Sequence, residues 1–388
     1  MKTEIKRRKF GNTGLEVSEL SLGAMNLRLL DTIDEAYELL NFVLDQGVNL
    51  IDTARAYNGE NKSGQFVESE VLVGNTIRNR TDIDEPVIIV TKGHSYTPGD
   101  FYENLEISRS KLGIVDKLKI GNTEIRLVYF YHGISDERWE EIKSSGALEA
   151  AADAKKKGLI SYIGFSSHYA FGKVIKEAID TGIFDVIELP CNVFNRSLGE
   201  DGNIDLLKYA HDKGLGIINM KPFNGNGMNA IYRMIKDFIT IDYKAMLNFC
   251  LSNPYISTVD AGARYVHEFR EDIEVAKGER LTAEQLKALT QEADKISPHM
   301  NNICRECMHC MEKFECVKKI DFPGILAVYA RYKIAKLLDK ETRSFIEQYK
   351  NFTLNAETCI KCGKCKPWCE YKLDIPEMLV EAHEALSN

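Results

Sequence analysis

The chain has 388 residues, of which 44% are hydrophobic and 28% are charged, and its formal net charge is −8. This length exceeds what one hydrophobic core usually supports, so we expect one large domain and one smaller domain. The 27 glycines and 9 prolines exclude collagen-like and low-complexity chains, and the composition excludes a membrane-spanning protein. The acidic excess argues against nucleic acid as a partner.

Short apolar runs that end in small or polar residues alternate with longer amphipathic stretches from residue 19 onward. This alternation predicts parallel strands joined by crossover helices. The runs occupy residues 20–25, 48–54, 86–92, 126–133, 159–167, 184–190, 215–222 and 256–262. Eight strand-helix units in roughly 250 residues fit a TIM barrel. A doubly wound open sheet is the alternative, but no Gly-rich dinucleotide fingerprint follows the first run.

Four polar residues follow successive strands at the end where TIM barrels place their chemistry. They are Asp52, Tyr57, Lys92 and His132. Taken singly, each has an ordinary explanation: a helix cap, a rim aromatic, a solvated lysine or a core histidine. Together they meet one chemical requirement. A phenol is a poor acid at neutral pH unless a cation stabilises its phenolate, a carboxylate can hold that cation, and a neutral histidine can orient a carbonyl.

Residues 8 to 277 resemble the aldo-keto reductase family through KFGNTGLEVSELSLGAMNL, GVNLIDTARAYNG, SEVLVG, VIIVTK and VYFYHG. The resemblance implies a TIM barrel in which a nicotinamide hydride adds to an aldehyde or ketone carbon while Tyr57 protonates the oxygen. It implies that Lys92 lowers the pKa of Tyr57, that Asp52 pairs with Lys92, and that His132 aligns the carbonyl. Oxidation of an alcohol uses the same groups in reverse.

The same resemblance suggests where the cofactor binds. It implies nicotinamide contacts after the fifth and sixth strands, from Ser166, Ser167, Glu188 and Asn192. The segment after the eighth strand resembles the family's phosphate and adenine segment, and its residues are Gly262, Ala263, Arg264, Glu271 and Asp272. A phosphate contact from Arg264 favours NADPH, whereas the carboxylate of Asp272 in place of an amide favours NADH, so both cofactors stay open.

Cysteines crowd into the C-terminal part, where eight of the ten lie: Cys304, Cys307, Cys310, Cys316, Cys359, Cys362, Cys365 and Cys369. The basic N-terminus has no apolar core of an export signal, so we expect a reducing cytoplasm. There, clustered cysteines indicate metal rather than disulfides. Triplets at intervals of three favour iron-sulfur clusters over zinc, which usually takes paired knuckles. Cys191 and Cys250 are expected to be ordinary barrel residues.

The second run, CIKCGKCKPWCEYKLDIP, resembles bacterial ferredoxin motifs. By that analogy Cys369 completes the 4Fe-4S cluster of the first triplet and Cys316 completes that of the second. The residues between the two runs look helical, so the tail resembles an α-helical ferredoxin module, and the whole chain resembles the aldo-keto reductase subgroup that carries one. We expect a barrel over 1–280, a connecting helix over 281–298 and a dicluster domain over 299–388.

Three functions fit these features. The chain is a carbonyl reductase acting on a small molecule, an electron-transfer protein that couples nicotinamide to an external redox partner, or a redox-sensing regulator. The intact set of Asp52, Tyr57, Lys92 and His132 favours the reductase, because neither alternative needs a tyrosine acid.

Overall fold

The computed structural model describes residues 5–168, 172–196, 204–223, 241–295, 303–304, 310–311, 314–337, 339–369 and 372–387. Backbone contacts divide the chain into two compact units. The first comprises Met1–Pro222 and Lys244–Leu281, and the second comprises Phe223–Tyr243 and Thr282–Asn388. In the part of the chain that is described, no helix has both the length and the apolar character needed to cross a membrane.

The first unit is a closed barrel of eight parallel strands, as the sequence predicts. Neighbouring strands pair in the order β3, β4, β7, β9, β10, β11, β12 and β13, and β13 pairs with β3 to close the ring. Their bounds are Leu20–Gly23, Leu50–Asp52, Val87–Gly93, Thr123–Tyr131, Tyr162–Ser166, Val186–Pro190, Gly216–Met220 and Thr258–Ala261. Each strand lies within or overlaps one of the eight apolar runs, because strands covered on both faces need apolar side chains on both.

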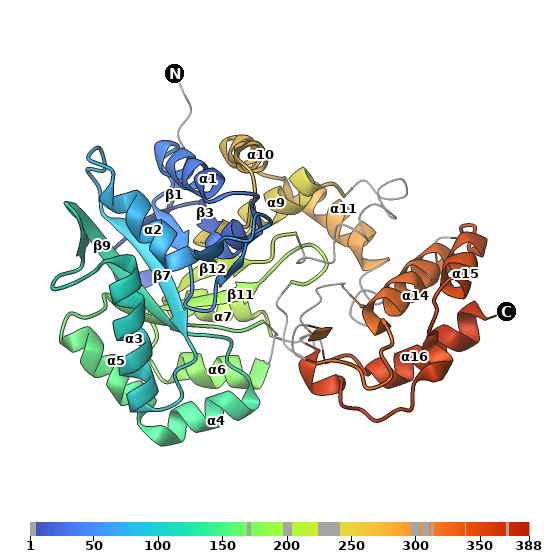
Figure 1. Ribbon diagram of the computed structural model, residues 1–388. Helices are drawn as coiled ribbons and strands as arrows, with labels where there is room; N and C mark the ends of the chain where they lie inside the picture. The colour runs from blue at the N-terminus through green and yellow to red at the C-terminus, as the bar shows by residue number, and fades with distance from the viewer. Residues whose placement is uncertain are drawn as a thin grey trace. The chain divides into compact units, whose positions relative to one another are not determined.

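Helices surround the barrel strands (Figure 1). They are α1 Ile33–Asp45, α2 Ser69–Arg78, α3 Pro98–Leu112, α4 Asp136–Ser145, α5 Ala147–Lys156, α6 Gly172–Asp180, α7 Leu206–Asp212, α9 Tyr243–Leu251 and α10 Val266–Lys277. Thr32 begins α1 and Thr97 begins α3, each through a capping box with the acidic residue three positions later. These caps determine the residue at which each of the two helices begins.

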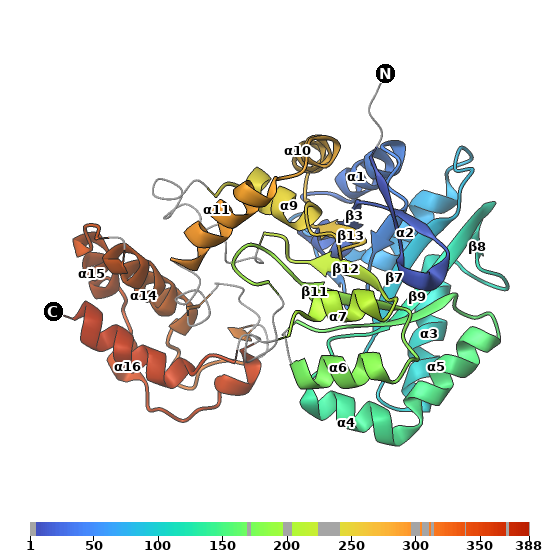
Figure 2. The same cartoon turned by 180° about the vertical axis from the view of Figure 1, so that it is seen from behind.

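The N-terminal end of the barrel is plugged by the hairpin of β1 Arg7–Lys9 and β2 Glu16–Ser18, which encloses the short helix η1 Gly11–Thr13. Phe10 and Val17 from this hairpin belong to one buried cluster with Leu50, Val128 and other strand residues. Figure 2 shows the barrel strands from behind, among them β3, β12 and β13. The opposite end of the barrel is the one at which the polar residues gather.

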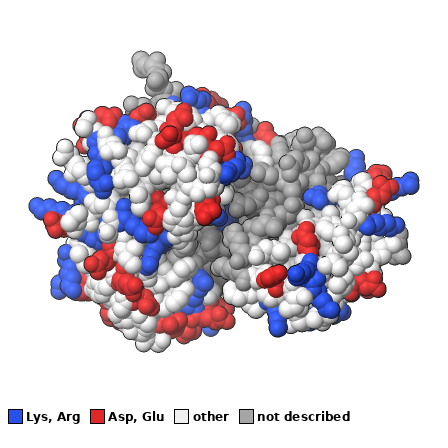
Figure 3. Space-filling model, in the orientation of Figure 1, with Lys and Arg blue, Asp and Glu red and all other residues white. Residues whose placement is uncertain are grey.

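The fourth strand differs from its prediction. It begins at Thr123 rather than at residue 126, because β8 Lys119–Ile120 folds back on it as an antiparallel hairpin. The residues after the first barrel strand, β3, form η2 Ala24–Leu29, which precedes α1. The residues after the second barrel strand, β4, form the small hairpin of β5 Asn58–Glu60 and β6 Phe66–Glu68. On the face drawn in Figure 3, acidic and basic side chains are interspersed.

The second unit is built from helices in its described residues. They are α11 Ala283–Asp294, α14 Phe322–Leu337, α15 Arg343–Lys350, η3 Ala356–Thr358, η4 Lys366–Trp368 and α16 Ile375–Leu386. The capping box predicted at Thr282 and Gln285 is present at the start of α11. Tyr329 of α14 donates to Glu381 of α16 at 3.1 Å, so a partly buried hydrogen bond joins two of the helices around this unit's core.

Candidate active site and cysteine pocket

The structure brings the four predicted residues to the carboxyl ends of neighbouring strands. Asp52 ends β4, Lys92 lies near the end of β7, and His132 directly follows β9. Tyr57 lies in the loop after β4, and backbone hydrogen bonds hold it there: its N–H donates to Ala54 at 3.0 Å and its carbonyl accepts from Ser69 at 3.0 Å.

Lys92 is the centre of this group, although its side chain is only 1% exposed. Its Nζ donates to the Asp52 carboxylate and lies 3.4 Å from the hydroxyl of Tyr57. It also lies 3.4 Å from the carboxylate of Glu188. Burial alone would lower the pKa of Lys92, but the Asp52 and Glu188 carboxylates outweigh burial and raise it, so the side chain is an ammonium.

Tyr57 and His132 are both neutral in this environment. Burial raises the pKa of Tyr57 above its usual 10, and the lowering effect of Lys92 only partly offsets it. Lys92 therefore lowers the pKa of Tyr57, but by less than burial of the phenol raises it. Burial, followed by Lys92, lowers the pKa of His132 well below 6.5. The His132 ring lies 5.8 Å from the Tyr57 ring and stacks on His94 at 4.8 Å.

Of the residues expected to contact nicotinamide, Ser166, Ser167 and Asn192 bond to neighbouring loops, whereas Glu188 contacts Lys92. Ser166 accepts from Gly133 N–H at 3.0 Å, and the Ser167 hydroxyl donates to Ile134 at 3.1 Å, so both serines hold the loop after β9. The Asn192 side chain donates to Lys221 at 2.9 Å. Glu188 on β11 instead points to Lys92, as described above.

The segment after β13 leads directly into α10, with Gly262, Ala263 and Arg264 between them. The backbone N–H of Arg264 donates to the carboxylate of Glu268 at 2.7 Å, so an acidic side chain of the helix itself caps this N-terminus. Burial, followed by Glu268 and Glu271, raises the pKa of Asp272 to about 7. Sequence reasoning named Glu271 and Asp272 but missed the cap at Glu268.

Asp260 is the second residue that sequence reasoning missed. It lies on β13 and accepts from Ser21 of β3 at 3.1 Å, and one oxygen each of Asp260, Asp52 and Glu188 lie within 4.8 Å of one another. Burial, followed by Glu188, raises the pKa of Asp260 to about 7. The signal was present in the sequence, because Asp260 is a polar residue near the end of the eighth apolar run, as Asp52 is in the second.

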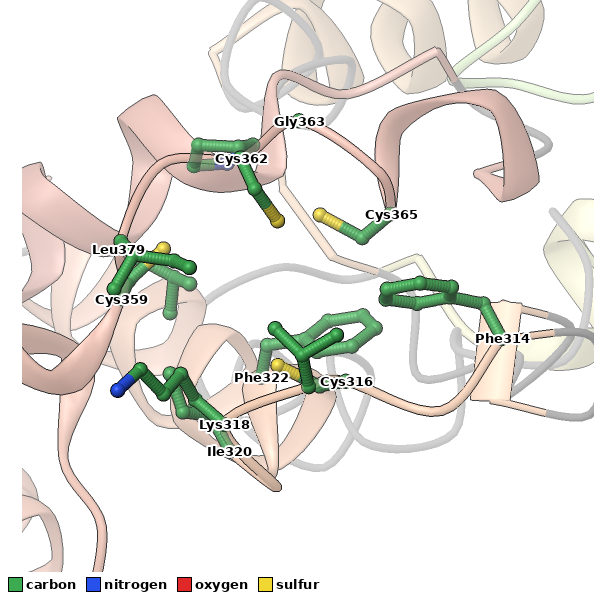
Figure 4. A pocket seen from close by; sticks show the side chains of 13 residues that line it. Phe314, Cys316, Lys318, Ile320, Phe322, Cys359, Cys362, Gly363, Cys365 and Leu379 are labelled. Atoms are coloured by element: carbon green, nitrogen blue, oxygen red, sulfur yellow. The ribbon is translucent and has the colours of Figure 1, made fainter.

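The second unit contains a pocket into which four cysteines project. Figure 4 shows the sulfur atoms of Cys362 and Cys365 pointing toward one another, with Cys316 on the facing segment. Cys359 completes the set, and the remaining lining is mainly apolar: Phe314, Val317, Ile320, Phe322, Ile360, Pro376 and Leu379. Burial, followed by the three neighbouring cysteines, raises the pKa of Cys365 to about 11. These four are the cysteines that the ferredoxin analogy grouped around the second triplet.

The remaining cysteines lie in two settings. Cys310 belongs to the buried core of the second unit, and Cys304 and Cys369 pack against that core, whereas Cys307 lies outside the described residues. Cys191 and Cys250 are buried in the barrel, where burial raises the pKa of Cys191 to about 12. Both are therefore packing residues with protonated thiols.

The closed barrel places this chain among the (β/α)8 enzymes. The family model described as "Aldo/keto reductase family" matches residues 19–240, and the chain belongs to that family. It is therefore an NAD(P)H-dependent oxidoreductase.

The chain is also similar to proteins named as oxidoreductases and to solved structures of the same fold. The chain is 28% identical over 320 residues to the uncharacterized oxidoreductase YqkF of Bacillus subtilis, covering 74% of this chain and 95% of that one. It is 29% identical over 226 residues to the uncharacterized oxidoreductase YrpG of Bacillus subtilis, covering 55% and 65%. The holo form of aldo-keto reductase AKR11C1 from Bacillus halodurans shares the fold with a TM-score of 0.58 at 22% identity, covering 74% and 96%.

Proposed function

We propose that this oxidoreductase reduces an aldehyde or ketone, or oxidises the corresponding alcohol, with Tyr57 as the general acid or base. The observation that carries the proposal is the position of Lys92, whose Nζ lies 3.4 Å from the Tyr57 hydroxyl while it is paired with Asp52. A neutral tyrosine holds the proton that the substrate oxygen needs, and a buried ammonium beside it stabilises the phenolate that remains.

The other residues of the site have matching roles. His132 is neutral, so one ring nitrogen donates a hydrogen bond to the substrate oxygen without delivering a full charge. Asp52 holds the Lys92 ammonium in place and compensates its burial. When bound, a nicotinamide cofactor supplies or accepts the hydride.

The residues that would hold the cofactor are those at the ends of β10, β11 and β13. Ser166, Ser167, Glu188 and Asn192 would line the nicotinamide end, and Gly262, Ala263, Arg264, Glu271 and Asp272 the adenosine end. Arg264 supports NADPH, because a guanidinium recognises a ribose phosphate. The Glu268 cap and the neighbouring carboxylates support NADH, because they would repel that phosphate.

A panel of aldehydes and ketones with NADPH and NADH tests this proposal under anaerobic conditions. Tyr57→Phe should abolish turnover because it removes the proton donor. Tyr102→Phe is a matched control, since Tyr102 on α3 donates to Asp153 and not to any residue of the site. Turnover by Tyr57→Phe at the rate of Tyr102→Phe would refute the mechanism.

We also propose that the second unit contains a ferredoxin-like dicluster domain, residues 299–388, preceded by the connecting helix 281–298. The pocket lined by Cys316, Cys359, Cys362 and Cys365 supports one 4Fe-4S cluster, because four thiolates in an apolar surrounding are the usual ligands of a cubane. Cys304, Cys307, Cys310 and Cys369 would hold the second. Iron and acid-labile sulfide analysis tests this, and zinc without sulfide would refute it.

The cysteine pocket also favours an electron-transfer role as the second candidate function. A hydride carries two electrons whereas each cluster accepts one, so exchange between nicotinamide and clusters needs a carrier such as a flavin or a redox partner protein. Anaerobic EPR during NADPH addition distinguishes the two functions. Clusters that stay oxidised without an added carrier support the reductase, and clusters that become reduced support electron transfer.

A further inference from the structure

Three carboxylates from three different strands converge on Lys92, although a single ammonium neutralises only one of them. They are Asp52 of β4, Glu188 of β11 and Asp260 of β13, and an oxygen of each lies within 4.8 Å of the others. Their exposed fractions are 1%, 3% and 9%. A Cβ on Gly23 would lie 2.5 Å from the Asp260 carboxylate, so the glycine leaves the space that this third carboxylate occupies.

The charge of this group does not balance if all three carboxyls are ionised. Lys92 contributes one positive charge, His132 and Tyr57 are neutral, and Ser21 contributes only a hydroxyl. Three carboxylates this close in a buried site do not all ionise. Asp52 and Glu188 both lie against the Lys92 ammonium, whereas Asp260 accepts from the neutral hydroxyl of Ser21, so the proton is assigned to Asp260. Burial and Glu188 raise the pKa of Asp52 as well, although the Lys92 ammonium opposes them. The groups that face Asp260 are Ser21, Asp52, Tyr57, Lys92 and Glu188.

We propose that Asp260 holds one proton and resupplies Tyr57 with it through Glu188 and Lys92. The inference rests on the proposed function, since it assumes that Tyr57 gives a proton to the substrate. These groups form a chain: an oxygen of Asp260 lies within 4.8 Å of one of Glu188, Glu188 lies 3.4 Å from Lys92 Nζ, and Lys92 Nζ lies 3.4 Å from the Tyr57 hydroxyl. Asp260 is the most exposed of the three carboxylates, so the store is refilled from water there.

The proton balance of the step closes without a further reactant. The Tyr57 O–H bond breaks and its proton goes to the substrate oxygen. Lys92 then gives one proton to the phenolate, and the proton of Asp260 passes by way of the Glu188 carboxylate to the lysine amine. The Asp260 carboxylate then takes one proton from water. One proton enters for each alcohol formed, and the sequence runs backwards during oxidation.

Infrared spectroscopy of the ligand-free protein tests the store independently of turnover. At about pH 6 the wild-type protein should show a protonated-carboxyl C=O band that Asp260→Asn removes and that Glu188→Gln weakens, because Glu188 helps to keep Asp260 protonated. Glu70→Gln is the matched control, because Glu70 is equally buried but accepts from Thr91 at 2.6 Å and not from Lys92. It should remove at most a band of its own. A wild-type spectrum that neither variant changes would overturn the proposal.

Kinetics supply the second readout. Asp260→Asn and Glu188→Gln should each lower kcat for carbonyl reduction about tenfold and increase the solvent isotope effect, because reprotonation of Tyr57 becomes slower. Glu70→Gln should keep the wild-type values, and so would both variants if the store did not exist. Two variants are used so that a folding failure of one leaves the test standing.

Three further outcomes distinguish the proton store from the proposed function and from a cation site. If Tyr57→Phe retains turnover while the protonated-carboxyl band is present, the proposed function fails and the proton store remains. If Tyr57→Phe is inactive and the band is absent, only the store fails. One equivalent of Mg²⁺ or Mn²⁺ that EDTA removes together with a change at these carboxylates would identify a cation site and overturn the proton store.

Discussion

Replacing Asp260 by asparagine should stabilise the barrel at alkaline pH and leave it little changed near pH 5. Burial and Glu188 raise the pKa of Asp260 from 3.8 to about 7 in the folded protein. The folded state therefore binds a proton more tightly than the unfolded state. Stability is then greatest at low pH and falls as the pH rises from about 4 to about 7, because ionising this carboxyl costs more inside the barrel.

The magnitude follows from the size of the shift. Each pKa unit corresponds to about 1.4 kcal/mol, so the ionised Asp260 costs about 4 kcal/mol at pH 8 and less than half of that at pH 5. Asparagine removes this cost and weakens the hydrogen bond from Ser21, which is worth about 1 kcal/mol. We expect a net gain of about 3 kcal/mol at pH 8 and a change under about 1 kcal/mol at pH 5.

The assay is anaerobic urea unfolding at several pH values, followed by tryptophan fluorescence. The chain has 2 tryptophans: Trp139, buried on α4 of the barrel, and Trp368 in the second unit. A Trp368→Phe background makes the signal report the barrel alone. Asp272→Asn is the comparison variant, since Asp272 has a similar pKa but lies outside the carboxylate group. Asp260→Asn with the wild-type pH dependence would refute the reasoning.

Three other changes have distinct expected outcomes. Lys92→Met should abolish activity and cost about 3–5 kcal/mol of unfolding free energy at pH 8, because it leaves the Asp52 carboxylate buried and unpaired; an active, equally stable variant would contradict this. Cys316→Ser should lower the iron content from about eight to about four per chain on reconstitution, whereas unchanged iron would exclude Cys316 as a ligand. Phe101→Ala should lose about 3–5 kcal/mol, because Phe101 is fully buried against Tyr129 and Tyr131; a loss below about 1 kcal/mol would contradict that packing.

The sequence was sufficient to predict the barrel and the polar residues at the carboxyl ends of its strands. Buried parallel strands read as continuous apolar runs, and each of the eight runs contains or overlaps a barrel strand. Asp52, Lys92 and His132 could be placed together because parallel strands end at one edge. The hairpin of β8 with β9 was not predicted, because two short paired segments around Gly121 carry too few apolar residues to read as strands.

Side-chain contacts across the barrel could not be predicted from the sequence. Glu188 was expected beside the cofactor, but its approach to Lys92 depends on how β11 and β7 face each other across the ring, and no local pattern records that. Asp260 was overlooked for the same reason. In the second unit the grouping of Cys316 with Cys359, Cys362 and Cys365 did follow from the ferredoxin analogy, although 42 residues separate Cys316 from Cys359.

Transfer of deuterium tests the central claim most directly. The protein is incubated anaerobically with a carbonyl compound that supports turnover and with NADPH or NADH carrying deuterium at the transferable position of the nicotinamide. The product is analysed by NMR. Carbonyl reduction with Tyr57 as the acid predicts an alcohol with deuterium on the former carbonyl carbon, formed by the wild-type protein and not by Tyr57→Phe. An alcohol without deuterium, or equal labelling by Tyr57→Phe, would contradict it.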